Sequence, residues 1–167
     1  YQYMKYREYQ GEIDFLTGVM GRRLFLQHCQ NIQSDQRIHG HQGWFLFLDV
    51  DWFKQINDKL GHIAGDETLK KFAMFLKEQF EPYGAVGRVG GDEFAVMIEE
   101  EMSQEALEEE MKQFFQNISG IQKEVTVSCS IGVYRFKYPK TIKELLTKTD
   151  EILYEAKANG RGCFVIR

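Results

Sequence analysis

The chain has 167 residues, which suits one domain of ordinary size, and its 43% hydrophobic and 14% aromatic content is enough to build a core. The formal net charge of -4 excludes the broad basic footprint of a nucleic-acid-binding domain, so a polyanionic ligand would need a few placed cations or metal ions. No apolar run approaches the roughly 20 residues of a membrane-spanning helix, and Cys29, Cys129 and Cys163 lack disulfide or zinc spacing, which fits reduced thiols in the cytoplasm.

The N-terminal part of the chain predicts a linker, an amphipathic helix and a buried strand. Residues 1–13 are polar and aromatic with a weak helical period, and the chain opens on Tyr rather than Met. We therefore expect the end of a linker helix from an upstream domain, followed by one domain over 14–167. Apolar positions recur at helical spacing from 21 to about 38. The nearly continuous apolar run WFLFLDV at 44–50 is typical of a strand buried on both faces.

Two acidic residues are expected to begin the next two helices. Asp51 follows the strand and can cap a short helix over 52–60. Asp66 can cap a longer helix over 67–80. The glycine-rich segment between the two helices is expected to interrupt the helical structure.

The middle of the chain predicts a β-hairpin and a helix. Two short apolar runs, 85–89 and 94–99, are separated by Gly-Gly-Asp-Glu at 90–93, and turn residues between such runs indicate a hairpin. Ser103 is placed to cap an acidic amphipathic helix that reaches residue 118.

The C-terminal part completes the predicted sheet. It predicts a strand over 125–133, a long helix over 141–159 that Gly160 ends in the left-handed conformation, and a final strand over 164–166. Helices thus alternate irregularly with about five strands, two of them in a hairpin. This pattern predicts an α/β (α+β) fold in which helices wrap a mixed central β-sheet.

Carboxylates stand at the end of the buried strand and at the tip of the hairpin. Burying the Asp49 carboxylate at the end of the strand costs free energy unless a cation pairs with it. Asp92 and Glu93 follow two glycines, which let the backbone approach a ligand closely. Brought together, these carboxylates would make an oxygen site for Mg²⁺, the usual agent that neutralises charge in phosphoryl transfer. The alternative is that Asp51 is only a helix cap and Asp92 only a turn residue.

The string GGDEF at 90–94 is preceded by Arg88, and other blocks occur in a matching order. These blocks are Asp14–Gly18 with Arg22 and Arg23, Asp49–Asp58, Gly61 and His62 with Gly65 and Asp66, Val127–Val133, and Asp150–Arg161. Together they resemble the motifs of the GGDEF-domain diguanylate cyclases over residues 14–167.

This resemblance implies a fold akin to nucleotidyl cyclases and polymerase palms. It also implies a nucleotidyltransferase of bacterial second-messenger signalling, which condenses two GTP molecules into cyclic di-GMP and releases two pyrophosphates. Each subunit of a homodimer would hold one GTP, and each 3′-hydroxyl would attack the α-phosphate of the other GTP. Residues 14–167 would then be the catalytic domain.

The resemblance further implies catalytic and metal-binding residues. Asp49, Asp92 and the Val50 carbonyl would bind two Mg²⁺ ions per active site, for which Mn²⁺ can substitute. Asp92 is the expected proton acceptor, and Glu93 its partner as base or metal ligand. Lys54 would stabilise the pentavalent phosphorus transition state.

Five residues are implied on the phosphate side of the substrate. The free N–H groups of Trp52 and Phe53 would meet phosphate at the start of a helix. Lys157 and Arg161 are four residues apart and would bind the β- and γ-phosphates, although cations there would also stabilise a helix C-terminus. Arg88 would lie on the phosphate side of the site, or would support the residues that contact the substrate and metal.

Three residues are implied on the nucleoside side. Asn57 and Asp66 match the positions that read guanine, and a carboxylate that accepts from N1–H and the exocyclic amine favours GTP over ATP. His62 would lie near the ribose, although a loop histidine is also often simply exposed.

Regulation is expected to differ from that of many relatives. They carry an RxxD motif before the hairpin that binds product and inhibits the enzyme, whereas this chain has Glu81 and Gly84 there. We therefore expect the product-inhibition site to be missing.

The alternative to an active enzyme is a catalytically silent GGDEF-type module that binds GTP or a partner. Expected partners are GTP, a second copy and an upstream sensor or regulatory domain, with no nucleic acid. The catalytic domain is expected in the cytoplasm, although the full-length protein could be membrane-anchored.

Overall fold

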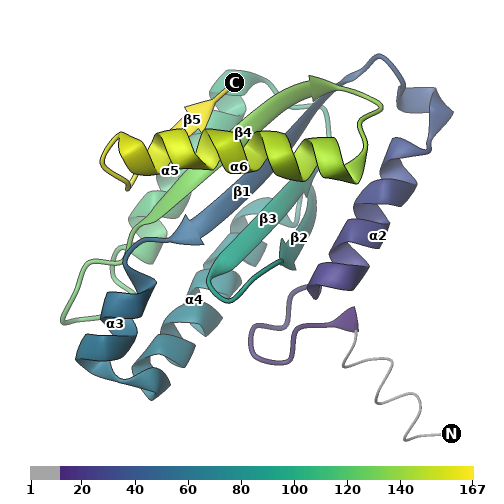
Figure 1. Ribbon diagram of the computed structural model, residues 1–167. Helices are drawn as coiled ribbons and strands as arrows, with labels where there is room; N and C mark the ends of the chain where they lie inside the picture. The colour runs from purple at the N-terminus through teal and green to yellow at the C-terminus, as the bar shows by residue number, and fades with distance from the viewer. Residues whose placement is uncertain (1–11) are drawn as a thin grey trace, which may run out of the picture.

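The computed structural model describes residues 12–167 as one mixed sheet with helices on both faces (Figure 1). The strands are β1 (Gln42–Val50), β2 (Gly84–Arg88), β3 (Glu93–Ile98), β4 (Cys129–Lys137) and β5 (Phe164–Ile166). The helices are α2 (Arg22–Gln33), the short 3-10 helix η1 (Gln36–Ile38), α3 (Phe53–Leu60), α4 (His62–Phe80), α5 (Gln104–Ile118) and α6 (Ile142–Ala158). Most of the predicted linker at 1–13 falls outside the described residues.

The five strands lie in the order β2-β3-β1-β4-β5, which confirms the predicted mixed sheet. β1 is central and pairs antiparallel with both β3 and β4, while β5 pairs parallel with β4. Every residue of β1 after Gln42 is buried, as the apolar run predicted. β2 and β3 form the predicted hairpin, so the end of β1 lies beside the hairpin tip.

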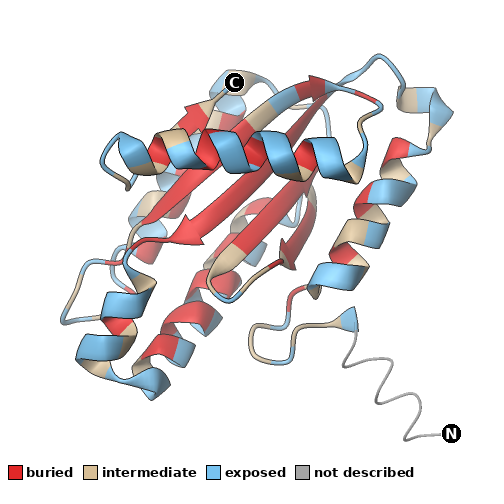
Figure 2. Ribbon diagram, viewed as in Figure 1, coloured by how far each residue is buried: buried red, intermediate tan, exposed pale blue. Residues whose placement is uncertain are grey.

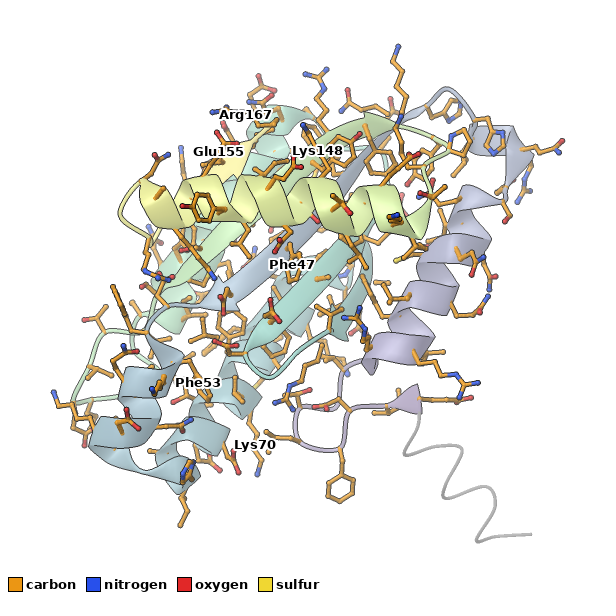
Figure 3. The ribbon with its side chains drawn as sticks, in the orientation of Figure 1. Phe47, Phe53, Lys70, Lys148, Glu155 and Arg167 are labelled. Atoms are coloured by element: carbon orange, nitrogen blue, oxygen red, sulfur yellow. The ribbon has the colours of Figure 1, made fainter. Side chains whose placement is uncertain are left out.

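Alternate residues of β1 build two cores. Leu46 and Leu48 belong to a core with apolar residues of α4 and α5, and Phe45 and Phe47 belong to a second core with residues of α2 and α6. Buried residues accordingly run along the strands and along one side of each α-helix (Figure 2). Figure 3 shows Phe47 beneath α6. In residues 12–167, no helix combines the length and apolar character needed to cross a membrane.

Two predicted element boundaries are wrong. The first helix ends at Gln33 rather than near residue 38, because the Asp35 carboxylate accepts the Arg37 N–H (3.0 Å) and starts the separate 3-10 turn. Strand β4 begins at Cys129 rather than at 125 and runs on to Lys137, because its whole length pairs with β1.

Both acidic caps are also wrong. Trp52, not Asp51, occupies the cap position of α3, and no side chain caps that helix. Helix α4 begins at His62, so Asp66 lies inside it. The physical reason is Gly61, whose φ of 89° turns the chain within one residue from α3 into α4. Ser103, by contrast, caps α5 as predicted, because its Oγ accepts the Ala106 N–H (3.2 Å).

Candidate active site

Strand pairing brings the predicted carboxylates together. Asp49 lies opposite Glu93 in the register of β1 and β3. The next N–H along β1, that of Val50, donates to the Asp92 carbonyl over 3.2 Å. Two segments more than forty residues apart in sequence thus meet at one end of the sheet, with Val50 as the last residue of its strand.

The Asp49 carboxylate is strongly perturbed. Burial and the neighbouring Asp92 carboxylate raise its pKa to about 6, against the opposing effect of an ion pair with the Lys157 ammonium group. Burial and the charge of Asp49 also raise the pKa of Glu93. Crowded carboxylates of this kind favour a bound cation.

The donor set fits Mg²⁺. Asp49 Oδ1 is buried and has no hydrogen-bond partner within residues 12–167, although a buried carboxylate oxygen normally has one. No group of three or more His, Cys, Asp or Glu side chains in this part of the chain is arranged to hold a metal. Mg²⁺ does not require such a group, because it commonly takes one or two carboxylates together with substrate phosphates and water.

The start of α3 offers free N–H groups beside these carboxylates. Its first backbone hydrogen bond runs from the Ile56 N–H to the Trp52 carbonyl (3.0 Å), so the N–H groups of Phe53 and Lys54 lie ahead of it. Trp52 has a left-handed backbone (φ 57°), which turns the chain sharply from β1 into the helix. The Lys54 side chain is exposed. These features fit phosphate binding.

The predicted guanine-reading residues lie on two packed helices. Helices α3 and α4 contact each other, and the Asn57 amide lies against Gly65. A Cβ at Gly65 would stand only 1.7 Å from Asn57 Oδ1, so glycine leaves the room that the amide occupies. Asp66 follows Gly65 directly and is exposed, as is His62 at the start of α4.

Arg88 supports the hairpin tip. Its guanidinium donates to the carbonyls of Gly90 (3.2 Å) and Gly91 (2.7 and 3.0 Å) and to the Asp14 carboxylate (3.1 Å). Burial raises the pKa of Asp14, but hydrogen bonds from Thr17 and the charge of Arg88 outweigh burial and hold that pKa below its ordinary value. Arg88 thus lies behind the tip that carries Asp92.

Sequence reasoning missed the role of Asp51. Its buried carboxylate accepts from the hydroxyls of Ser128 (2.7 Å) and Ser130 (2.6 Å) and from the Gly162 N–H (2.8 Å). This carboxylate therefore ties the end of β1 to the loop that carries Arg161. Ser128 and Ser130 lie more than seventy residues from Asp51 in the sequence, so no local spacing could have indicated these contacts.

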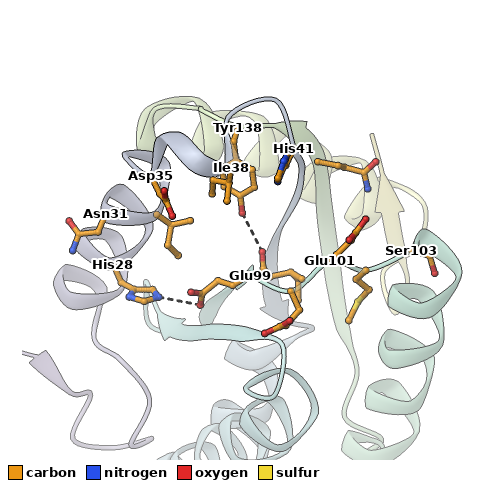
Figure 4. Close-up of a pocket in the computed structure, with 14 residues that line it drawn as sticks. His28, Asn31, Asp35, Ile38, His41, Glu99, Glu101, Ser103 and Tyr138 are labelled. Atoms are coloured by element: carbon orange, nitrogen blue, oxygen red, sulfur yellow. Dashed lines mark hydrogen bonds and ion pairs between the residues drawn. The ribbon is translucent and has the colours of Figure 1, made fainter.

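A cavity of about 920 Å³ lies at the other end of the sheet, where β1 begins and β3 ends (Figure 4). It contains none of the predicted site residues, and its lining includes the glutamates at 99–101. Such an acidic lining is unsuited to a triphosphate. The histidines near it do not form a metal site in the described chain: His28 pairs with Glu99 (3.2 Å) and His39 bonds to the Gln33 carbonyl (3.0 Å).

Known proteins resemble this chain in sequence and in fold. The family model described as diguanylate cyclase, GGDEF domain, matches residues 12–163. The chain is 33% identical over 164 residues to diguanylate cyclase DgcS of Shewanella oneidensis, covering 96% of this chain and 55% of that protein. It is 38% identical over 152 residues to the probable diguanylate cyclase DgcI of Escherichia coli, covering 90% and 32% respectively. The chain thus spans about half or less of the length of these relatives.

Solved structures share the fold. The GGDEF domain of TpbB (YfiN) from Pseudomonas aeruginosa superposes with a TM-score of 0.77 at 32% identity, covering 92% of this chain and 93% of that one. The coiled coil and GGDEF domain of DgcB from Caulobacter crescentus, solved with c-di-GMP, gives a TM-score of 0.88 at 20% identity, covering 99% and 91%. The family match, the relatives and the shared fold together show that this chain belongs to the GGDEF-domain diguanylate cyclase family.

Proposed function

We propose that this chain is an active diguanylate cyclase domain, which works as a homodimer with Mg²⁺ and joins two GTP molecules into cyclic di-GMP. The observation that carries the proposal is the buried Asp49 carboxylate, which faces the carboxylates of the hairpin tip and has one oxygen without a hydrogen-bond partner among residues 12–167. The Lys157 ammonium group pairs with it, and the first N–H groups of α3 follow a few residues later in the chain, as a triphosphate requires.

Each subunit holds one GTP in this proposal. The amide of Asn57 and the carboxylate of Asp66 address the guanine edge, and His62 lies near the ribose. The N–H groups of Trp52 and Phe53 bind phosphate at the start of α3. Because each subunit supplies only half of the reacting groups, the two sites must face each other before reaction.

The carboxylates of Asp49 and Asp92, with Glu93 and the Val50 carbonyl, would hold two Mg²⁺ ions, or Mn²⁺ in their place. When bound, the metal offsets charge on the α-phosphate and lowers the pKa of the attacking hydroxyl. The Asp92 carboxylate accepts the proton of the 3′-hydroxyl, assisted by Glu93.

The cationic side chains act on the phosphates. Lys54 stabilises the charge that develops at the α-phosphate, and Lys157 and Arg161 hold the β- and γ-phosphates that depart as pyrophosphate. Lys157 must exchange its Asp49 partner for phosphate oxygens. Arg88 keeps the hairpin tip in place through Asp14 and the glycine carbonyls.

Feedback through the usual inhibitory site is proposed to be absent. Glu81 stands at the arginine position and Gly84 at the aspartate position of the RxxD motif of relatives. The positive charge of the motif is therefore reversed and its carboxylate is missing. A side chain at Gly84 is also obstructed, because a Cβ there would lie 1.8 Å from the Met97 carbonyl oxygen.

Mass spectrometry of the products formed from GTP and Mg²⁺ at high protein concentration tests the main proposal, with Asp92→Ala as the matched variant. Cyclic di-GMP from the original chain alone is the expected result. GTP binding without product, even when a fused coiled coil enforces dimerisation, would instead identify a catalytically silent binding module. The upstream sensor domain and the cytoplasmic location stay predictions.

A further inference from the structure

Two residues beside the proposed phosphate site share an unusual backbone. Trp52 (φ 57°) and Arg161 (φ 65°) are the two non-glycine residues with positive φ in the described part of the chain. A left-handed backbone is unfavourable for residues with a Cβ, so the surroundings must hold both residues in place.

The two residues contact each other. The guanidinium carbon of Arg161 lies 4.3 Å from the centre of the Trp52 ring, a close cation–π contact. Trp52 is nevertheless 56% exposed. Its exposed ring therefore serves as a platform for the guanidinium rather than as part of the core.

A second contact joins the same two segments. The carboxylate of Asp51, the residue before Trp52, accepts the N–H of Gly162, the residue after Arg161, over 2.8 Å. Residues 51–52 and 161–162 thus form a clasp between the start of α3 and the loop after α6. Neither contact joins neighbours in sequence, so the clasp exists only in the folded domain.

We propose that this clasp positions Arg161 for the terminal phosphates of a nucleoside triphosphate, and that the Trp52 ring and the Asp51 carboxylate are positioning residues for that arginine. Stacking uses the face of the guanidinium and leaves its N–H edge free for phosphate oxygens. Within residues 12–167, the Trp52 ring contacts the face of the guanidinium and the Arg161 backbone N–H donates to the Ala156 carbonyl (3.2 Å), so neither contact occupies the N–H edge. The clasp makes binding depend on the length of the phosphate chain.

This inference rests on the proposed function, because it assumes a GTP site, and the test separates the two. Calorimetry would compare a non-hydrolysable GTP analogue with GMP, both with Mg²⁺. Trp52→Ala is expected to weaken binding of the triphosphate about tenfold and to leave GMP binding unchanged, because only the triphosphate reaches Arg161. Trp52→Phe, which keeps an aromatic face, should retain most of the affinity.

A double-mutant cycle shows whether Trp52 acts through Arg161. In an Arg161→Ala background, Trp52→Ala should cost no further triphosphate affinity. Tyr154→Ala removes a 74% exposed aromatic ring from α6 and is the matched control, expected to bind both nucleotides normally. Circular dichroism would verify that each variant is folded.

Fluorescence gives a second measurement without catalysis. Trp44, the other tryptophan of the chain, is 2% exposed, so Trp44→Phe leaves Trp52 as the sole reporter. The triphosphate analogue should change its emission and GMP should not. If Trp52→Ala weakened the affinity for both nucleotides equally, or for neither, the proposed role of the clasp would be wrong while the cyclase proposal stands. Absence of triphosphate binding by the original chain would overturn both.

Discussion

The ammonium group of Lys157, in the last turn of α6, forms an ion pair with the carboxylate of Asp49 at the end of β1. The Asp49 side chain is 12% exposed and the Lys157 side chain 30% exposed. A cation from the chain itself therefore accompanies the carboxylate proposed to bind metal. Burial and Asp92 nevertheless outweigh this cation, and the pKa of Asp49 stays raised at about 6.

Asp49→Asn is expected to stabilise the metal-free domain while abolishing cyclase activity. The folded pKa of about 6 exceeds the ordinary 3.8, so the folded state holds this proton more tightly than the unfolded state does. The stability from Asp49 is thus present below about pH 4 and is lost as the pH rises to about 6. At about pH 7 the amide should raise the free energy of unfolding by roughly 1 kcal/mol.

Urea unfolding in EDTA at about pH 4 and about pH 7 measures this effect. Asp58→Asn, which changes an exposed carboxylate on α3, is the control and should keep the pH dependence of the original chain. An Asp49→Asn variant less stable than the original at neutral pH would contradict the assignment.

Gly65→Ala should weaken nucleotide binding with little effect on stability. The added methyl group meets Asn57 Oδ1 at 1.7 Å and must displace that flexible amide, whereas alanine improves helix propensity by about 1 kcal/mol. We expect GTP affinity to fall about tenfold, as loss of one hydrogen-bonding contact would cause. Calorimetry with Gly120→Ala, where a Cβ meets nothing within 4 Å, is the comparison. Normal GTP affinity in Gly65→Ala would remove Asn57 from the base site.

Arg88→Lys should lower kcat more than it raises KM. A lysine cannot bridge the Asp14 carboxylate and the carbonyls of the hairpin tip at once, so the tip that carries Asp92 loses its support. We expect roughly a tenfold loss in kcat and about 1–2 kcal/mol in stability. Steady-state kinetics would show it, with the exposed Arg23→Lys as control. A rise in KM alone would mean that Arg88 binds substrate directly.

Cyclic di-GMP should inhibit the enzyme weakly or not at all. Glu81→Arg supplies the missing cation but should not create inhibition, because the aspartate position is occupied by Gly84. Gly84→Asp should cost about 2–4 kcal/mol in stability, because its Cβ would collide with the Met97 carbonyl, which is backbone and cannot turn aside. Initial rates at rising product concentration, with thermal unfolding of each variant, test both points. Strong inhibition of the original chain would reveal a different product site.

The mixed sheet, the hairpin, the buried central strand and the family could all be predicted from the sequence. Those features depend on local periodicity, on turn residues and on motifs of fixed spacing, all of which can be read along the chain. The boundary between α3 and α4 could not be predicted, because Gly61, with its φ of 89°, turns one helix into the next, whereas the neighbouring Gly65 lies inside α4.

The contacts of Asp51 and Trp52, by contrast, could not be predicted from the sequence and follow from the fold. In the sequence Asp51 has the position of a helix cap, but in the fold its carboxylate turns to Ser128, Ser130 and Gly162. The physical reason is that a buried carboxylate takes whichever donors the fold brings to it, and these donors come from segments more than seventy residues away. The contact of the Trp52 ring with Arg161 likewise depends on the path of the chain after α6, which no local pattern contains.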